Sequence, residues 1–308
     1  MTLKENNSTH PNSSWQIDFL ERNALEAGYL TKAAQLFDPI LHSQKLNLTL
    51  LKKPLIIGIN GTQGSGKSTL ADYLKSYACA EGLSAVSISL DDFYLTRKER
   101  FQLSRDTHPL LITRGVPGTH DIALAMRTLN RLSQKTGTAT IPRFDKSRDD
   151  RYPKEHWEKA QLPVQLILLE GWCLGAKPQP DDSLKVPVNQ FEKNHDANQA
   201  WREYVNNALA KNYQSLFEKV DQWVMLRAPS FDAVYKWRLH QEEKLKKKIL
   251  TQGKPLPPEI MQPNEIKRFI EHYQRITETT LIDLPKRVHH LYHLDELREI
   301  TSYETPVA

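Results

Sequence analysis

Residues 55–68, with the sequence LIIGINGTQGSGKS, decide the fold of this chain. The apolar run at residues 55–60 predicts a buried strand, and residues 69–80 have the composition of a helix. Between them, residues 61–68 match the pattern G-x-x-x-x-G-K-[S/T] of the phosphate-binding loop. A glycine-rich turn without a ligand is the alternative, but the motif stands between a strand and a helix, as a phosphate-binding loop requires. The stretch therefore predicts an α/β fold that binds a nucleotide.

Each part of this loop has an expected contact with the nucleotide. Glycines let the backbone wrap around a phosphate, and the amides at the start of the next helix point toward it. Lys67 is expected to reach the β- and γ-phosphates, and the Ser68 hydroxyl to bind a magnesium ion. The residues predicted to bind the nucleotide are Gly61, Thr62, Gln63, Gly64, Ser65, Gly66, Lys67, Ser68 and Thr69.

The composition is typical of a soluble globular protein. The 308 residues suffice for one large or two modest domains, and 39% are hydrophobic and 26% charged. A net charge of +5 fits a nucleic-acid binder or an enzyme that binds two anions. Cys79 and Cys173 are too few for a disulfide framework or a zinc cluster, and they fit a reducing compartment. No apolar run approaches the length of a membrane span, and the first 14 residues lack a signal-peptide core, so we expect a cytoplasmic protein.

The N-terminal 50 residues differ from the rest of the chain. Residues 1–13 are polar and are expected to be disordered. From Trp15 to about Leu46, apolar residues recur at helical spacing, and Gly28 marks a break. We therefore predict two helices in front of a nucleotide-binding domain that covers residues 51–308. These helices could be a structural extension or could contact a substrate or partner.

Carboxylates follow two further predicted strands. Residues 84–90 predict a strand that ends at Asp91 and Asp92, at the sheet edge where α/β proteins bind ligands. One of the two could accept the proton of an attacking hydroxyl, or both could cap the next segment. The apolar run at residues 164–169 ends at Glu170, which has the position of a Walker B acid and would orient magnesium.

Two polar stretches between these strands carry positive charge. Residues 95–120 contain two glycines and two prolines near their end and predict a loop, in which Arg114 and His120 are candidate anion contacts. Asp121 either joins them or caps the helix at residues 122–132. Residues 138–153 begin like a strand and become densely charged. There, Arg143 and Lys146 could face a carboxylate or a phosphate, or lie on a solvated surface.

The C-terminal half predicts alternating helices and strands. Residues 174–194 are rich in proline and charge and predict an excursion close to the site, which could reshape it. Helices are expected at residues 198–217, 230–250 and 264–280, and strands at residues 221–226 and 288–294. The long helix carries Arg238, which could close over the site as the arginine of a mobile lid.

Several of these segments together carry a family resemblance. They read SLDDFY at residues 89–94, TRGVPGTHD at 113–121, PRFDKS at 142–147, EGWCLG at 170–175 and WRLHQE at 237–242. From about Pro54 onward the chain resembles the uridine kinase, phosphoribulokinase and pantothenate kinase group. Within that group it is similar to the D-glycerate 3-kinases of the plant and cyanobacterial type and to related fungal and bacterial kinase-like proteins.

The resemblance implies a P-loop NTPase fold, in which helices flank a parallel sheet, with the N-terminal helices as an extension. It also implies MgATP as phosphate donor and a small hydroxylated acceptor. Asp91 matches the acid of the D-x-F-Y motif and would be the base, and Glu170 matches the Walker B acid. Residues in the segments expected near the acceptor are Asp92, Tyr94, Arg114, Thr119, His120, Arg143 and Lys146.

The sequence thus predicts an ATP-dependent small-molecule kinase with a hydroxy acid, D-glycerate, as acceptor. In this prediction Lys67, Asp91 and Arg238 are catalytic, and Ser68 and Glu170 hold magnesium. A kinase for a nucleoside, a pantothenate-like acid or a sugar is one alternative, and a nucleotide-dependent regulatory ATPase is another. A nucleic-acid-dependent NTPase would fit the positive charge, but the sequence has no recognisable nucleic-acid-binding motif. Neither a nucleic-acid nor a membrane partner is expected.

Overall fold

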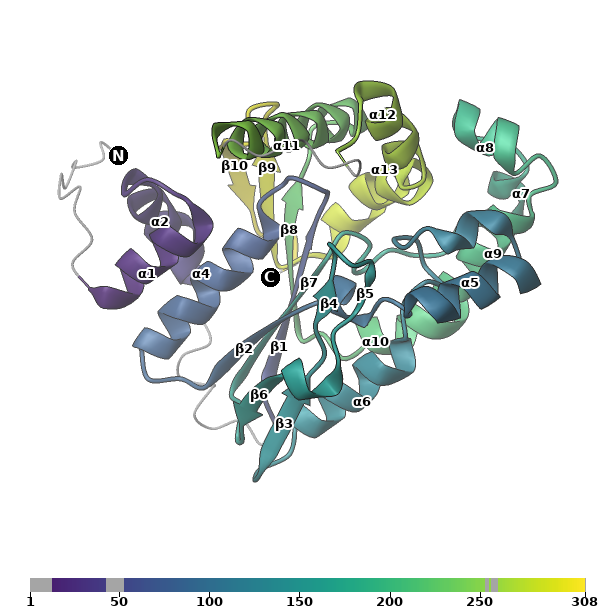
Figure 1. Ribbon diagram of the computed structural model, residues 1–308. Helices are drawn as coiled ribbons and strands as arrows, with labels where there is room; N and C mark the ends of the chain where they lie inside the picture. The colour runs from purple at the N-terminus through teal and green to yellow at the C-terminus, as the bar shows by residue number, and fades with distance from the viewer. Residues whose placement is uncertain (1–12, 43–52, 253–254, 256–259, 308) are drawn as a thin grey trace.

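The computed structural model describes residues 13–42, 53–252, 255 and 260–307. Within these residues, the main sheet has six strands in the order β10-β9-β8-β1-β7-β2 (Figure 1). Their bounds are β1 Leu55–Gly61, β2 Ala85–Ser89, β7 Leu166–Gly171, β8 Gln222–Arg227, β9 His290–Leu294 and β10 Ile300–Glu304. Two small antiparallel pairs join β3 (Thr138–Ile141) to β6 (Glu158–Gln161) and β4 (Phe144–Asp145) to β5 (Asp150–Arg151).

The topology of the main sheet positions the site. The strand β1 pairs in parallel with β7 on one side and with β8 on the other, and β2 and β9 extend the sheet in parallel. Ile59 pairs with Glu170, so the carboxyl ends of β1 and β7 lie next to each other. This parallel arrangement confirms the predicted fold class. The antiparallel strand β10 was not predicted, because the exposed residues 300–304 lack an apolar run.

Helices cover both faces of the sheet, and side chains alternate between the two layers. Ile57 and Ile59 belong to a core with α1 (Ser14–Asn23), α2 (Gly28–His42), α4 (Lys67–Ala80) and α11 (Phe231–Thr251). Ile56 points to a second core with α6 (Ile122–Leu132) and α10 (Gln214–Phe217). The other helices are α5 Arg97–Asp106, α7 Asp181–Leu184, α8 Gln190–His195, α9 Ala200–Ala208, α12 Pro263–Glu271 and α13 Gln274–Asp283. Figure 1 shows α1, α2 and α4 together, away from α6 and α10.

The two predicted N-terminal helices are present and pack on α4. The first ends at Ala24, which has the left-handed conformation (φ 51°), and the second begins at Gly28. The rings of Phe19 and Phe37 both contact Tyr73 of α4, whose hydroxyl donates a hydrogen bond of 2.7 Å to Asp38. The expected disorder of residues 1–13 falls almost wholly outside the described residues.

The prediction of a loop over residues 95–120 was wrong for its first half. Helix α5 occupies Arg97–Asp106, and a short 3-10 helix follows at Pro109–Ile112. A capping box between Thr96 and Glu99 starts α5, and Arg100 is fully buried beneath it. The glycines that suggested a loop lie beyond both helices.

None of residues 174–194, the predicted excursion, lines the cleft at the carboxyl edge of the sheet. The excursion contains α7 and α8 and packs against α13 through a buried ion pair of 2.6 Å between Glu192 and Arg275. The predicted helix at residues 198–217 is interrupted by one π turn at Leu209–Tyr213. Within the described residues, no helix is both long and apolar enough to span a membrane.

Candidate active site

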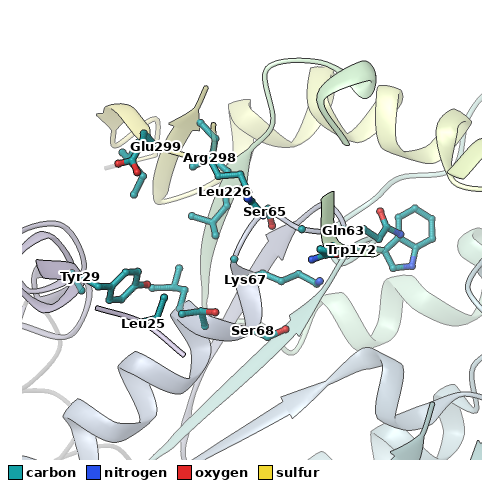
Figure 2. A pocket seen from close by; sticks show the side chains of 18 of the residues that line it. Leu25, Tyr29, Gln63, Ser65, Lys67, Ser68, Trp172, Leu226, Arg298 and Glu299 are labelled. Carbon is teal, nitrogen blue, oxygen red and sulfur yellow. The ribbon is translucent and has the colours of Figure 1, made fainter. Parts of the chain in front are cut away.

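A cleft of about 1160 Å³ lies at the carboxyl edge of the sheet. The phosphate-binding loop forms its floor through Gln63, Gly64, Ser65, Gly66, Lys67, Ser68 and Thr69. Gly61 and Thr62, which were also predicted to bind nucleotide, do not line the cleft, because Gly61 ends β1 and Thr62 is buried at 4% exposure. Figure 2 shows Lys67 and Ser68 between Tyr29 on one side and Trp172 on the other.

Two glycines give the loop its shape. Gly64 (φ +80°) and Gly66 (φ +92°) are in the left-handed region, which side chains disfavour. A Cβ atom on Gly64 would also lie 3.0 Å from Cβ of Trp237 on α11. Helix α4 begins at Lys67, so its first, unpaired amides face the cleft. The loop therefore offers the backbone donors and the positive helix end that bind phosphate.

Ser68 and Glu170 are close enough to share one cation. The Ser68 hydroxyl donates a hydrogen bond of 2.9 Å to Oε1 of Glu170. The other oxygen, Oε2, is buried, accepts no hydrogen bond within the described residues and lies 3.8 Å from Nζ of Lys67. A hydroxyl and one carboxylate suit magnesium, which keeps several waters and takes its remaining ligands from substrate phosphates. No cluster of three or more potential His, Cys, Asp or Glu metal ligands is found among the described residues.

Asp91 points into the cleft and is held by two partners. Its Oδ2 accepts a hydrogen bond of 2.7 Å from Nζ of Lys146, and its Oδ1 accepts one of 2.9 Å from the Tyr94 hydroxyl. Burial favours the neutral form of the carboxyl, but the charges of Lys146 and Lys67 outweigh burial and lower its pKa to about 2. Asp91 is thus an ionised acceptor next to the phosphate-binding loop.

His120 supports Tyr94 from behind and does not line the cleft. Their rings stack at 4.4 Å between centroids, and Nδ1 of His120 lies 2.6 Å from the Tyr213 hydroxyl. Burial lowers the pKa of His120 to about 4, although Asp91 acts in the opposite direction. His120 is only 5% exposed and does not line the cleft, so its predicted contact with the acceptor stays a prediction.

Asp92, Arg143 and Thr119 also lie behind the cleft. Asp92 accepts a hydrogen bond from the Ser89 amide, which caps the 3-10 helix Leu90–Phe93, and forms an ion pair of 2.6 Å with Arg143. Arg143 also binds Glu158. Thr119 is fully buried and makes hydrogen bonds to the backbone of its own turn. None of these three side chains lines the cleft, so their predicted contact with the acceptor stays a prediction.

Arg114 lies on the wall of the cleft, near Lys146. It forms an ion pair with Asp149, and its guanidinium lies 5.4 Å from the centroid of the Phe144 ring. Asp121, for which two roles were open, accepts a hydrogen bond from the Leu124 amide and caps α6. Of the predicted acceptor residues, the structure brings Tyr94, Arg114 and Lys146 to the cleft.

Arg238 reaches the same cleft from α11. It forms an ion pair of 2.7 Å with the buried Glu242 and lies 5.8 Å from the Phe269 ring. Glu242 also accepts a hydrogen bond of 2.8 Å from the Met261 amide. Arg238 therefore places a positive charge on the wall of the cleft.

The sequence did not indicate several lining residues. Trp172 donates a hydrogen bond of 3.1 Å to the Gly115 carbonyl and packs edge-on against Tyr273. Trp172 directly follows Gly171 at the end of β7, and this position could have identified it as a candidate residue of the site. Other lining residues that were missed include Leu25, Gly28, Tyr29, Lys32, Leu36, Leu226, Gln241, Phe269, Leu294, Arg298, Glu299 and Ile300.

A phosphate-binding loop, a strand-end carboxylate and basic side chains around one cleft define a P-loop phosphotransferase. Comparison with known proteins agrees. Residues 56–176 match the model of the phosphoribulokinase / uridine kinase family. The kinase mug58 of Schizosaccharomyces pombe is 35% identical over 246 residues, which cover 77% of this chain and 84% of that protein. The chain therefore belongs to the phosphoribulokinase and uridine kinase family of P-loop kinases.

Two further relatives have a named substrate. Chloroplastic D-glycerate 3-kinase of Arabidopsis thaliana is 34% identical over 211 residues, which cover 66% of this chain and 44% of that protein. The solved structure of D-glycerate 3-kinase from Cryptococcus neoformans is 27% identical, with a TM-score of 0.66, over 82% of this chain and 90% of that one.

Proposed function

We propose that this ATP-dependent kinase transfers the γ-phosphate of ATP to a hydroxyl of a small hydroxy acid, with D-glycerate as the first candidate. The observation that carries the proposal is that an ionised Asp91 shares one cleft with the phosphate-binding loop and with the cations Arg114 and Lys146. The similarity to D-glycerate 3-kinases supports the choice of acceptor.

The residues of the loop side bind the donor. The amides of the loop and Lys67 hold the β- and γ-phosphates, and Ser68 and Glu170 hold magnesium, which neutralises charge on the phosphates. The oxygen of the acceptor hydroxyl bonds to the γ-phosphorus while the bond between that phosphorus and the ADP oxygen breaks. Asp91 accepts the proton that the hydroxyl loses. Arg238 faces the same cleft and stabilises the charge of the transferring group.

The basic residues on the acceptor side favour an acid over a neutral nucleoside. Arg114 can bind a carboxylate through two parallel hydrogen bonds once Asp149 gives way, and Lys146 lies beside the base. Of the alternative acceptors, a pantothenate-like acid would use the same cations, whereas a neutral sugar or nucleoside would not need them.

The test is ADP release by the purified full chain with MgATP, with and without D-glycerate, beside a panel of hydroxy acids, sugars and nucleosides. We expect strong stimulation by D-glycerate and loss of transfer in Lys67→Ala. Stimulation by another acid would replace the acceptor and keep the mechanism. ATP binding without stimulation by any acceptor would overturn the kinase assignment of this site and favour a regulatory ATPase.

A further inference from the structure

The cleft continues well beyond the residues that the proposed reaction uses. On the far side of the phosphate-binding loop it is lined by Tyr29 and Leu36 of α2, by Leu226 at the end of β8 and by Leu294 at the end of β9. Figure 2 shows Tyr29 and Leu25 on this side of the loop, opposite Trp172, with Arg298 and Glu299 above them. Helix α2 and the segment before it thus form a wall of the same cleft.

The strand order decides what this end of the cleft would hold. Asp91 follows β2 and Glu170 lies on β7, so the transferred phosphate lies on the β7 and β2 side of β1. The strands β8 and β9 are on the opposite side of β1. A nucleotide whose γ-phosphate faces Asp91 therefore directs its nucleoside toward β8, β9 and α2.

The chemistry of this end suits a flat base. Its sides are apolar and aromatic, with Leu36, Leu226 and the partly buried ring of Tyr29, which packs against Phe19 at 5.8 Å. Burial raises the pKa of Tyr29 to about 12, so its hydroxyl adds no negative charge. At the rim of this end of the cleft, Lys32 of α2 and Glu299 form an ion pair of 2.7 Å.

We propose that α2, together with the segment that joins it to α1, forms the base-binding wall of the nucleotide site and that Tyr29 packs against the base. The inference rests on the proposed kinase function, because it requires a nucleotide whose γ-phosphate faces Asp91. It gives α2 a role in binding the donor, in addition to its packing on α4.

Binding of MgATP and of magnesium tripolyphosphate to the full chain tests this proposal, because tripolyphosphate has no base. Calorimetric titration of Tyr29→Ala should show an affinity for ATP about ten-fold lower and an unchanged affinity for tripolyphosphate, because only ATP has a base that can stack on the aromatic ring. Tyr29→Phe should bind both ligands like the wild type.

A second variant adds bulk without removing a packed side chain. Gly28 lines the cleft at the start of α2, and a Cβ atom there would meet nothing within 4 Å. Gly28→Leu should fold. It should weaken the binding of ATP and leave the binding of tripolyphosphate unchanged. Trp15→Ala is the matched control, because Trp15 contacts Tyr73 and Tyr77 of α4 but does not line the cleft.

The two proposals can fail separately. An unchanged ratio of the ATP and tripolyphosphate affinities in Tyr29→Ala and Gly28→Leu would overturn the base-binding wall, even if the protein phosphorylates an acceptor. An equal loss in Trp15→Ala would assign the effect to packing and would overturn it too. A wild-type chain that binds ATP but has no acceptor would contradict only the proposed function, while binding of neither ligand would overturn both.

Discussion

Asp91 and Asp92 are adjacent carboxylates with different surroundings. Asp91 faces the cleft between Lys146 and Tyr94, whereas Asp92 faces the interior and binds Arg143. Burial is the largest influence on Asp92 and raises its pKa, despite the opposing charge of Arg143. Asp91 is therefore positioned for the proposed proton transfer, whereas the contacts of Asp92 are structural.

Substitution of each by asparagine should separate these tasks. We expect Asp91→Asn to lower kcat by about 10²–10⁴-fold, the usual contribution of a general base, and to leave ATP affinity within about three-fold. The matched control Asp92→Asn should keep most of the turnover and lose about 1–3 kcal/mol of unfolding free energy, because a buried ion pair is broken. Steady-state kinetics measures the turnover of the two variants, and urea unfolding measures their stability. Near wild-type turnover in Asp91→Asn would refute the role of Asp91 as base.

At the scale of elements, the phosphate-binding loop depends on its contact with α11. Gly64 lies under Trp237, and Trp237 is held by a hydrogen bond of 2.6 Å from its indole nitrogen to the Glu296 carbonyl. The segment between β9 and β10 therefore fixes α11, and α11 in turn fixes the loop. These contacts connect the segment between β9 and β10 to the phosphate-binding loop.

Gly64→Ala tests this contact, and Gly82→Ala is its matched control. Both glycines have φ near +80°, so alanine should cost about 1–2 kcal/mol of stability at either position. A Cβ atom on Gly82 meets nothing within 4 Å, whereas on Gly64 it meets Trp237. We expect only Gly64→Ala to weaken ATP binding, by ten-fold or more in a titration. Similar ATP binding by the two variants would show that the contact with α11 is unimportant.

At the scale of the whole molecule, several buried histidines make stability depend on pH. Burial lowers the pKa of His120, His272 and His290 to about 4 in each case. The unfolded chain binds a proton to each histidine near pH 6.5, but the folded chain does so only near pH 4. The free energy of unfolding is therefore highest above pH 6.5 and falls as the pH drops from 6.5 toward 4.

Urea unfolding at pH 7, 6 and 5 should show this loss of stability. Each such histidine contributes up to about 1.4 kcal/mol per pH unit, because the unfolded state then holds one more proton. His290 lies on β9, away from the cleft, and His290→Gln should make the pH dependence of the free energy of unfolding shallower. Substitution of the exposed His156 should leave that dependence unchanged. A stability that is constant from pH 7 to pH 5 would contradict this account.

The parts that could be predicted from the sequence are those with a local signal. The loop at residues 61–68 and the acids that end β2 and β7 follow apolar strands, so their place at one sheet edge could be inferred. Arg114 and Arg143 both stand in charged segments, and only the fold decides that Asp92 and Glu158 keep Arg143 out of the cleft. The role of Tyr29 in lining the cleft depends on how α2 docks on α4, which no motif encodes.

The two edge strands of the main sheet, β10 and β2, both carry polar features. At one edge, β10 covers the largely buried strand β9 and presents exposed polar residues such as Thr301, Ser302 and Glu304. At the other, the side chain of Arg143 donates a hydrogen bond of 3.1 Å to the Ser87 carbonyl of β2. Because free strand edges invite pairing with other chains, we expect these two features to disfavour aggregation through the edges of the sheet.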